Sequence, residues 1–304
     1  MHAWESIQKV LDYIEDHLEQ IHSPEELSKV AALSPFYFQR LFTRLVKRPV
    51  NEYIKMRRLA RACESLSDRN KRILDIAVGC GFNSHESFTK TFKAAFGITP
   101  DEYRANPVHL NQVTKPELLL NYTMVDEGVP LITENIVIEI TRRKLDFPEM
   151  YIGLSDKVSF DQAALGETTG ISSPGQLWDL FHKNKEKMSC LVPDGIELGA
   201  SMFDENTDGT FTYFAGASAV PGVSVPEGVT LWELPSAEYI VCSFEAENFT
   251  ELITCAINKA FKYLFETWLP GNKLAATPFS AEKYISMAEG NARMELWVIP
   301  VSAA

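Results

Sequence analysis

The stretch "GCGFNSHESFTKTFKAAFGITPDEY", residues 79–103, decides the fold of the first third of the chain. It begins with a glycine-flanked turn, after which apolar residues recur at the spacing of a helix. Ser84 followed by Glu86 is a helix-start signal, because a capping side chain is followed by an acid in the first turn. The stretch therefore predicts a tight turn and then a helix over residues 84–96.

The same pattern occurs 50 residues earlier in the chain. The matching positions are Ser34, Phe38, Arg40, Phe42, Glu52 and Tyr53 with Ser84, Phe88, Lys90, Phe92, Glu102 and Tyr103. Each block reads as a short helix, a tight turn, a helix that begins at the serine, and a glutamate–tyrosine pair that opens the next helix. Residues 1–105 therefore predict an all-α domain with two helix-turn-helix units in tandem.

The two second helices divide into a core side and an outer side. At roughly 100° per residue, a narrow apolar stripe faces the core, formed by Phe38, Leu41, Phe42 and Leu45 in one helix and Phe88, Phe92 and Phe96 in the other. The outer face of the helix over 34–46 holds Phe36, Gln39, Arg40, Thr43 and Arg44. The outer face of the helix over 84–96 holds His85, Glu86, Thr89, Lys90 and Lys93. Amide, guanidinium and apolar groups of this kind can read base edges and phosphates.

The charge of the chain is unevenly distributed. The formal net charge is −12, yet residues 1–110 carry 16 Lys and Arg against 14 Asp and Glu, and the remainder carries 13 against 27. Basic residues also gather within residues 40–61, namely Arg40, Arg44, Lys47, Arg48, Lys55, Arg57, Arg58 and Arg61. This clustering predicts a polyanion-binding surface on an otherwise acidic protein.

The sequence pattern changes after the helical part. Residues 106–134 are rich in proline and polar residues and predict a linker with one short helix at 116–122. From 135 to 304, short β-branched and aromatic stretches alternate with two helical patterns. The order strand, strand, helix, strand, strand occurs twice, which predicts an α+β domain with a duplicated β-α-β-β arrangement and a mainly antiparallel sheet.

The first part resembles the DNA-binding domain of AraC/XylS-type transcription regulators, through "GCGFNSHESFTKTFKAAFGITPDEYR" and "LSPFYFQRLFTRLVKRPVNEYIKMRRLARA". The resemblance implies double-stranded DNA as a partner, with RNA polymerase as a further one. It places Phe36, Gln39 and Arg40 on bases, and His85, Glu86 and Lys90 on bases or backbone. Two recognition helices held by a connecting helix over 50–66 would enter successive major-groove segments about 34 Å apart, so a monomer could bind an asymmetric site.

The second part resembles the duplicated GyrI-like domain, the small-molecule-binding module of multidrug-sensing regulators, and the domain order resembles the Rob-type branch. The motifs are "QLWDLF", "LPSAEYIVCSFEA" and "FSAEKYISMAEGNARMELWVIPV". The resemblance implies an effector held between the two repeats, with Glu282 as the charge that favours a cation. Candidate lining residues are Tyr239, Tyr284, Trp178, Trp268, Trp297 and Glu295. A carboxylate beside aromatic rings suits lipophilic cations.

The sequence shows no catalytic motif or metal spacing, so we expect a regulator without enzymatic activity, cofactor or metal. No apolar run approaches the ~20 residues of a membrane span, and the scattered cysteines and acidic first helix predict a cytoplasmic protein without a membrane partner. One alternative is a hydrolase of strained or activated electrophiles, with Glu282 as base and Tyr284 or Tyr239 as donor. Another is that the acidic half is a ligand-free interaction module.

Overall fold

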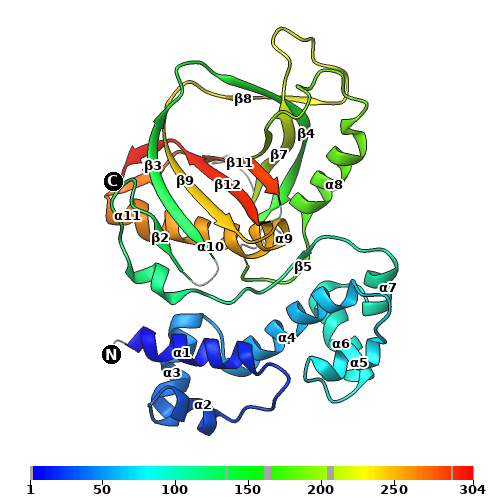
Figure 1. The fold of residues 1–304 in the computed structure, drawn as a ribbon, viewed down its shortest axis with the longest axis vertical. Helices are drawn as coiled ribbons and strands as arrows, with labels where there is room; N and C mark the ends of the chain where they lie inside the picture. Colours follow the sequence, from blue (N-terminus) through cyan, green and yellow to red (C-terminus); the bar gives the residue numbers. More distant parts are fainter. Residues whose placement is uncertain (1–2, 134–135, 161–165, 204–208, 289, 304) are drawn as a thin grey trace. The chain divides into compact units, whose positions relative to one another are not determined.

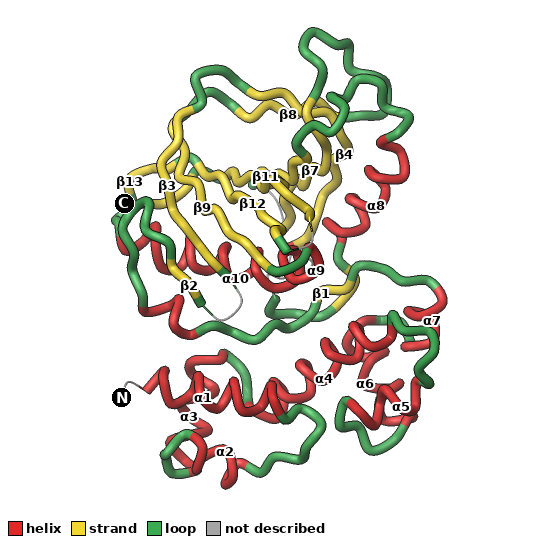
Figure 2. Tube along the Cα trace, in the orientation of Figure 1, coloured by secondary structure: helices red, strands yellow, loops and turns green. Residues whose placement is uncertain are grey.

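The computed structural model describes residues 3–133, 136–160, 166–203, 209–288 and 290–303 (Figures 1 and 2). The chain divides into two compact units, Met1–Tyr122 with Gly166–Ile171, and Thr123–Leu165 with Ser172–Ala304. The boundary that the sequence places between 134 and 135 lies outside the described residues.

The first unit is helical, as the periodicity predicts. Its helices are α1 Ala3–Asp16, α2 Pro24–Val30, α3 Pro35–Val46, α4 Val50–Leu66, α5 Ile73–Gly79, α6 His85–Phe96 and α7 Pro100–Ala105. The phenylalanine stripe of α3 packs with α1, α2 and the start of α4, and that of α6 packs with α5 and the end of α4. The all-α tandem helix-turn-helix arrangement is confirmed, and the long α4 carries residues of both cores.

The two repeats also share their helix ends. Ser34 and Ser84 cap α3 and α6, each accepting a hydrogen bond from the backbone N–H three residues ahead. Both helices end on a left-handed residue, Lys47 with φ 63° and Gly97 with φ 79°. The repeat is therefore visible in the backbone as well as in the sequence.

Segments beyond residue 105 complete the first unit. Strand β1 (Leu110–Asn111) pairs antiparallel with β5 (Gly170–Ile171). The 3₁₀ helix η1 (Leu118–Tyr122), at the position of the short helix expected from the sequence, buries Leu118 in the core of the first helix-turn-helix. Much of the expected linker is thus part of the helical unit.

The second unit is built on one antiparallel sheet. Its strands are β2 Leu131–Ile132, β3 Val137–Lys144, β4 Glu149–Ser159, β6 Glu197–Met202, β7 Thr210–Ser218, β8 Thr230–Leu234, β9 Glu238–Ala246, β11 Phe279–Ala288 and β12 Asn291–Val298. They lie in the order β2-β3-β9-β12-β11-β6-β7-β4-β8. Away from β2, this order reads symmetrically outward from the central β11–β6 pair, which is the duplication that the sequence predicts. A separate pair joins β10 (Leu274–Ala276) to β13 (Pro300–Ser302).

Helices cover one face of this sheet. Helix α8 (Ser173–Lys185) packs on β4 and β7. A second helical stretch packs on β9 and β12, and consists of α9 Phe249–Glu251, η3 Leu252–Ala256, α10 Ile257–Lys262, η4 Tyr263–Trp268 and α11 Leu269–Gly271. The strands curl away from these helices, so that the other face is concave (Figure 1). Within the described ranges, no helix is long and apolar enough to cross a membrane.

Candidate functional site

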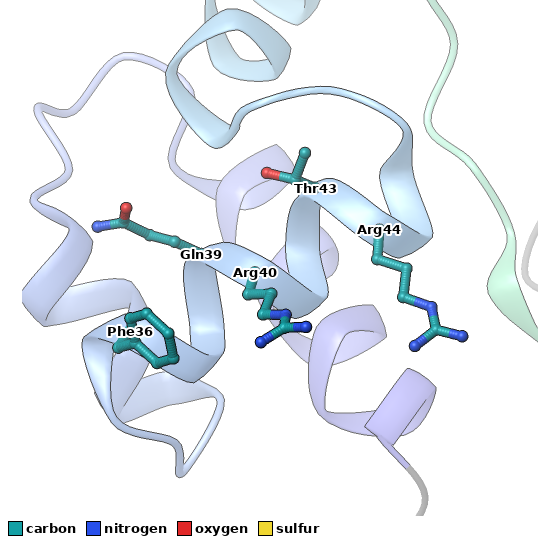
Figure 3. A pocket seen from close by; sticks show the side chains of 5 residues that line it. All are labelled: Phe36, Gln39, Arg40, Thr43 and Arg44. Atoms are coloured by element: carbon teal, nitrogen blue, oxygen red, sulfur yellow. The ribbon is translucent and has the colours of Figure 1, made fainter.

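The outer face of α3 presents the side chains expected to contact DNA. Phe36, Gln39, Arg40, Thr43 and Arg44 are all exposed and together line a shallow depression, shown in Figure 3. Phe36 is a large apolar ring with 67% of its surface exposed, so it is available for apolar contact with a ligand. Arg40 and Arg44 have no hydrogen-bond or ion-pair partner among the described residues, so both guanidinium groups remain available to a ligand. We name these five residues the α3 face.

Helix α6 presents a second face of similar make-up. His85 and Glu86 are exposed in its first turn, and Lys90 and Lys93 are exposed along it. Thr89 is only partly exposed, and its hydroxyl is buried without a partner among the described residues. Four of the five expected residues are therefore open to contact, and Thr89 is the least accessible.

Part of the basic cluster has a structural role. Arg57 donates hydrogen bonds to the Glu15 carboxylate, at 2.9 and 3.0 Å, and to the carbonyl oxygen of Val113. Arg58 donates to the carbonyl oxygens of Leu18, Gln20 and Gly81. Because these guanidinium groups join helices and turns inside the unit, they are less available to a polyanion than Arg40, Arg44, Lys47 and Lys55, which are exposed.

The seven expected effector residues do not form a single cage. Residues directly opposite one another on paired strands share a face of the sheet. Glu282 is opposite Leu296, whereas Lys283 is opposite Glu295, so the two glutamates point to opposite faces. Tyr284 and Trp178 lie with Glu282 on the helix-covered face, and Tyr239 and Trp297 lie with Glu295 on the concave face. Trp268 is buried in η4 and donates its indole N–H to the carbonyl oxygen of Val125.

Glu282 sits in a buried hydrogen-bond chain beneath α8. The Trp178 indole donates to the Tyr213 hydroxyl at 3.0 Å, and that hydroxyl donates to the Glu282 carboxylate, also at 3.0 Å. Gly199, opposite Glu282, makes room for the pair, since a Cβ there would lie 2.6 Å from the Tyr213 hydroxyl. Burial raises the pKa of Glu282 to about 7, although the bond from Tyr213 lowers it. This chain joins α8 to the sheet and is enclosed.

The concave face carries a different set of groups around Trp297. The Trp297 indole donates to Glu295 at 3.0 Å, and Tyr239 contacts the Trp297 ring edge to face. The Lys283 Nζ lies 3.8 Å from the centre of the Trp297 ring. Arg143 donates to Glu295 at 3.1 Å. Aromatic and ionic side chains thus meet on a face that no described helix covers.

The sequence did not point to Tyr213, Lys283 and Arg143, nor to Glu149, which accepts a hydrogen bond from Lys283. Side chains alternate between the two faces of a strand. Once β11 is paired with β12, this alternation places Lys283, Glu295 and Trp297 on the same face of the sheet. Register could not be known without the pairing itself.

The hydrolase alternative gains no support. Tyr239 lies on the opposite face from Glu282, and its hydroxyl donates to the carbonyl oxygen of Pro235. Tyr284 and Glu282 are both largely buried, and burial holds the pKa of Tyr284 well above its usual range. Across the part of the chain that the structure describes, no three His, Cys, Asp or Glu side chains gather as a metal site would require.

Comparison with known proteins identifies both units. A family model for a helix-turn-helix domain matches residues 27–106, and a model for an integron-associated effector-binding protein matches residues 167–301. The multiple antibiotic resistance protein MarA of Salmonella typhimurium is 34% identical over 104 residues, which are 34% of this chain and 82% of MarA. The HTH-type transcriptional regulator YbfP of Bacillus subtilis is 39% identical over 104 residues, and the match spans 35% of its length.

The solved structures that resemble this chain include an integron cassette protein from the mobile metagenome of Vibrio cholerae, 16% identical, with a TM-score of 0.42. The match covers 55% of this chain and 100% of that protein.

Proposed function

This chain belongs to the AraC/MarA-type family of DNA-binding transcription regulators and carries an effector-binding domain, and from that premise we propose that it reads an asymmetric DNA site through α3 and α6 under the control of a small effector. The observation that carries the proposal is the α3 face, where an amide, a hydroxyl, an exposed ring and two guanidinium groups without a partner among the described residues line one depression (Figure 3). These are the groups that bind guanine, adenine and thymine edges in the major groove.

The second half of the reader follows from the repeat. Helix α6 repeats the cap, the core stripe and the C-terminal turn of α3, and α4 joins the two helix-turn-helix cores. The two outer faces differ, because Glu86 and Lys93 of α6 take the places of Phe36 and Thr43. Two different readers on one chain select two different half-sites, about one helical turn apart.

Roles within α6 differ by charge. A carboxylate such as Glu86 accepts a hydrogen bond from a cytosine amino group and is repelled by phosphate. Lys90 and Lys93 are exposed cations suited to the phosphate backbone. In this proposal α3 supplies most of the base reading, while α6 supplies backbone contacts and a cytosine preference.

The effector site that we propose is the concave face of the second unit rather than the surroundings of Glu282. Trp297, Tyr239 and Glu295, three of the seven residues expected from the sequence, lie there together. Arg143 keeps 39% of its side chain exposed at the edge of this group, whereas Trp297, Tyr239 and Glu295 are buried. Glu282, Tyr284 and Trp178 instead connect α8 to the sheet.

The experiment that tests the reader is selection of bound duplexes from a random pool by the full-length protein at physiological salt. We expect one asymmetric motif with two contact blocks about a helical turn apart. A palindromic motif would indicate a dimeric reader, and no enrichment would show that the helical unit does not read sequence in the full-length protein.

A further inference from the structure

We propose that the effector is an aromatic anion, recognised on the concave face by Lys283 and Arg143 beside Trp297. This inference rests on the proposed function of the second unit, and it differs from the cationic effector that the sequence resemblance implies.

The position that a cationic ligand would take is already filled from within the chain. An ammonium group binds an aromatic ring best within about 6 Å of the ring centre. The Lys283 Nζ lies 3.8 Å from the centre of the Trp297 ring, and the guanidinium carbon of Arg143 lies 5.7 Å from it. A second cation would have to displace the Lys283 ammonium group from the face of this ring.

The carboxylates of this face are also occupied. Glu295 accepts hydrogen bonds from Arg143, Ser243 and Trp297, and its carboxylate lies 3.7 Å from the Arg293 guanidinium. An incoming cation would have to displace these internal donors. Glu295 is therefore not a free anion awaiting a positively charged ligand.

The second carboxylate is paired in the same way. Glu149 accepts a hydrogen bond from the Lys283 Nζ at 2.6 Å and another from the Tyr151 hydroxyl. Lys283 is 3% exposed overall, whereas the Glu149 side chain is 38% exposed, so the pair extends from the interior to the surface. Both glutamates thus already accept hydrogen bonds from within the chain, and neither is free to bind a cationic ligand.

The donors of the face, in contrast, are not all used. An ammonium group has three N–H donors and a guanidinium has five. Among the described residues, Lys283 bonds to Glu149 and to the Trp297 ring, and Arg143 bonds through one nitrogen. The indole N–H of Trp232 and the Nε–H of Arg293 are buried without a hydrogen-bond partner among the described residues, although the Arg293 Nε lies 4.0 Å from the Glu245 carboxylate. Unfilled donors favour a ligand that brings acceptor oxygens, and cationic donors favour a negative one.

The surroundings of these donors are aromatic. Trp232 stacks on Phe214 with ring centres 5.3 Å apart, and Tyr239 packs against Trp297 at 5.2 Å. Both pairs belong to one apolar cluster on the concave face. A flat aromatic body that carries one carboxylate, sulfonate or phosphate group matches this combination of rings and cationic donors.

The test compares two probes that share a ring system and differ in charge, naphthalene-2-sulfonate and trimethyl(2-naphthyl)ammonium. Binding of each to the full-length protein is measured by calorimetry. We expect the sulfonate to bind roughly tenfold or more tightly than the ammonium. The sulfonate oxygens can accept a hydrogen bond from a charged donor, whereas the trimethylammonium group cannot. In Lys283→Met the preference should disappear through loss of sulfonate affinity.

The matched control is Lys144→Met, which removes the same charge from a lysine whose side chain is 74% exposed. Lys144 follows Arg143 on β3 and therefore points to the opposite face, so its loss should leave the preference unchanged. If Lys283→Met fails to fold, Arg143→Gln at the exposed rim provides the second variant, and it should also weaken sulfonate binding selectively.

The outcomes distinguish the charge of the effector from the location of its binding site. Saturable binding that favours the ammonium probe would overturn the anionic effector and leave the concave face as the effector site. Absence of saturable binding by both probes would contradict the concave face itself. Sulfonate binding that persists in both Lys283→Met and Arg143→Gln would place the anion elsewhere and overturn the inference.

Discussion

The guanidinium group of Arg58 lies against the backbone of Gly81. Its Nη1 donates to the Gly81 carbonyl oxygen at 2.9 Å, and a Cβ at Gly81 would lie 2.7 Å from the guanidinium carbon. Arg58 is also bonded to the carbonyl oxygens of Leu18 and Gln20, so it cannot easily move aside. One side chain of α4 thus joins the turn of the second helix-turn-helix to the segment after α1.

This contact predicts the effect of Gly81→Ala. Gly81 has φ 78°, which strains any other residue, and the methyl group would also displace Arg58. We expect a loss of about 2–4 kcal/mol in the free energy of unfolding of the first unit. Gly97→Ala is the matched control, because Gly97 has φ 79° but nothing within 4 Å of its Cβ position. Chemical denaturation should show a loss of only about 1 kcal/mol there; equal losses would contradict the role of Arg58.

A second prediction concerns the segment after the helical domain. Leu118 is fully buried in the core of the first helix-turn-helix, and its backbone N–H donates to Gln8. Leu118→Ala should therefore lower the free energy of unfolding of the first unit by about 2–4 kcal/mol. The neighbouring Leu119 is only half-buried, so Leu119→Ala should cost clearly less. Similar small losses for both variants would show that the segment is only a linker.

The buried carboxyl of Glu282 predicts a pH dependence of stability. Its folded pKa is raised to about 7 by burial, above the usual value near 4.5. Between these values the folded state holds the proton more strongly than the unfolded state, so stability falls as pH rises from about 4.5 to 7. The loss is of the order of 3 kcal/mol at neutral pH.

Glu282→Gln should remove that slope, as followed by tryptophan fluorescence during denaturation at several pH values. Glu197 is the control of opposite sign. Burial would raise the pKa of Glu197, but hydrogen bonds from His182 and Lys185 lower it overall, so it stabilises the fold above its unfolded pKa and loses that contribution in acid. An unchanged slope in Glu282→Gln would show that Glu282 is not the group responsible.

The two kinds of DNA contact predict different mutant behaviour. Arg40→Ala removes a guanidinium from the α3 face, and should cost about 1–3 kcal/mol of binding and relax specificity at one position of the site. Lys93→Ala should weaken binding evenly across sequences and reduce the salt slope by about 1. Anisotropy titrations at several salt concentrations measure both effects, and identical behaviour of the two variants would contradict the assignment.

The helical unit was predictable from sequence because its information is local. The serine caps, the phenylalanine stripes and the 50-residue repeat each lie within one helix or turn, and the connecting helix over 50–66 is α4 itself. Local patterns do not show that β5, within residues 166–171, pairs with β1. They also do not show that Arg48 donates a hydrogen bond to the Glu167 carbonyl oxygen. That pairing joins residues far apart in the sequence, which periodicity does not report.

The placement of the proposed effector residues was less predictable for a physical reason. The pairing register of β11 and β12 decides which residues of the two strands share a face with Glu282 and Glu295. That register shifts by one residue at a bulge between Tyr284 and Ser286, which the sequence pattern does not show. Trp297, Tyr239 and Glu295 lie together in the structure, and their role in effector binding stays a prediction. Their internal partners Lys283 and Arg143 come from neighbouring strands, and strand order is a property of the whole sheet.

The most direct test of the account is an affinity titration of the selected duplex with full-length protein at physiological salt. Gln39→Ala/Arg40→Ala should bind at least ~30-fold more weakly than the wild type, since two base contacts of about 1–3 kcal/mol each are lost. Gln20→Ala/Arg69→Ala removes the same residue types from exposed positions outside α3 and α6, and should bind as the wild type does. Equal affinity of the wild type and Gln39→Ala/Arg40→Ala would contradict the claim that the α3 face reads DNA.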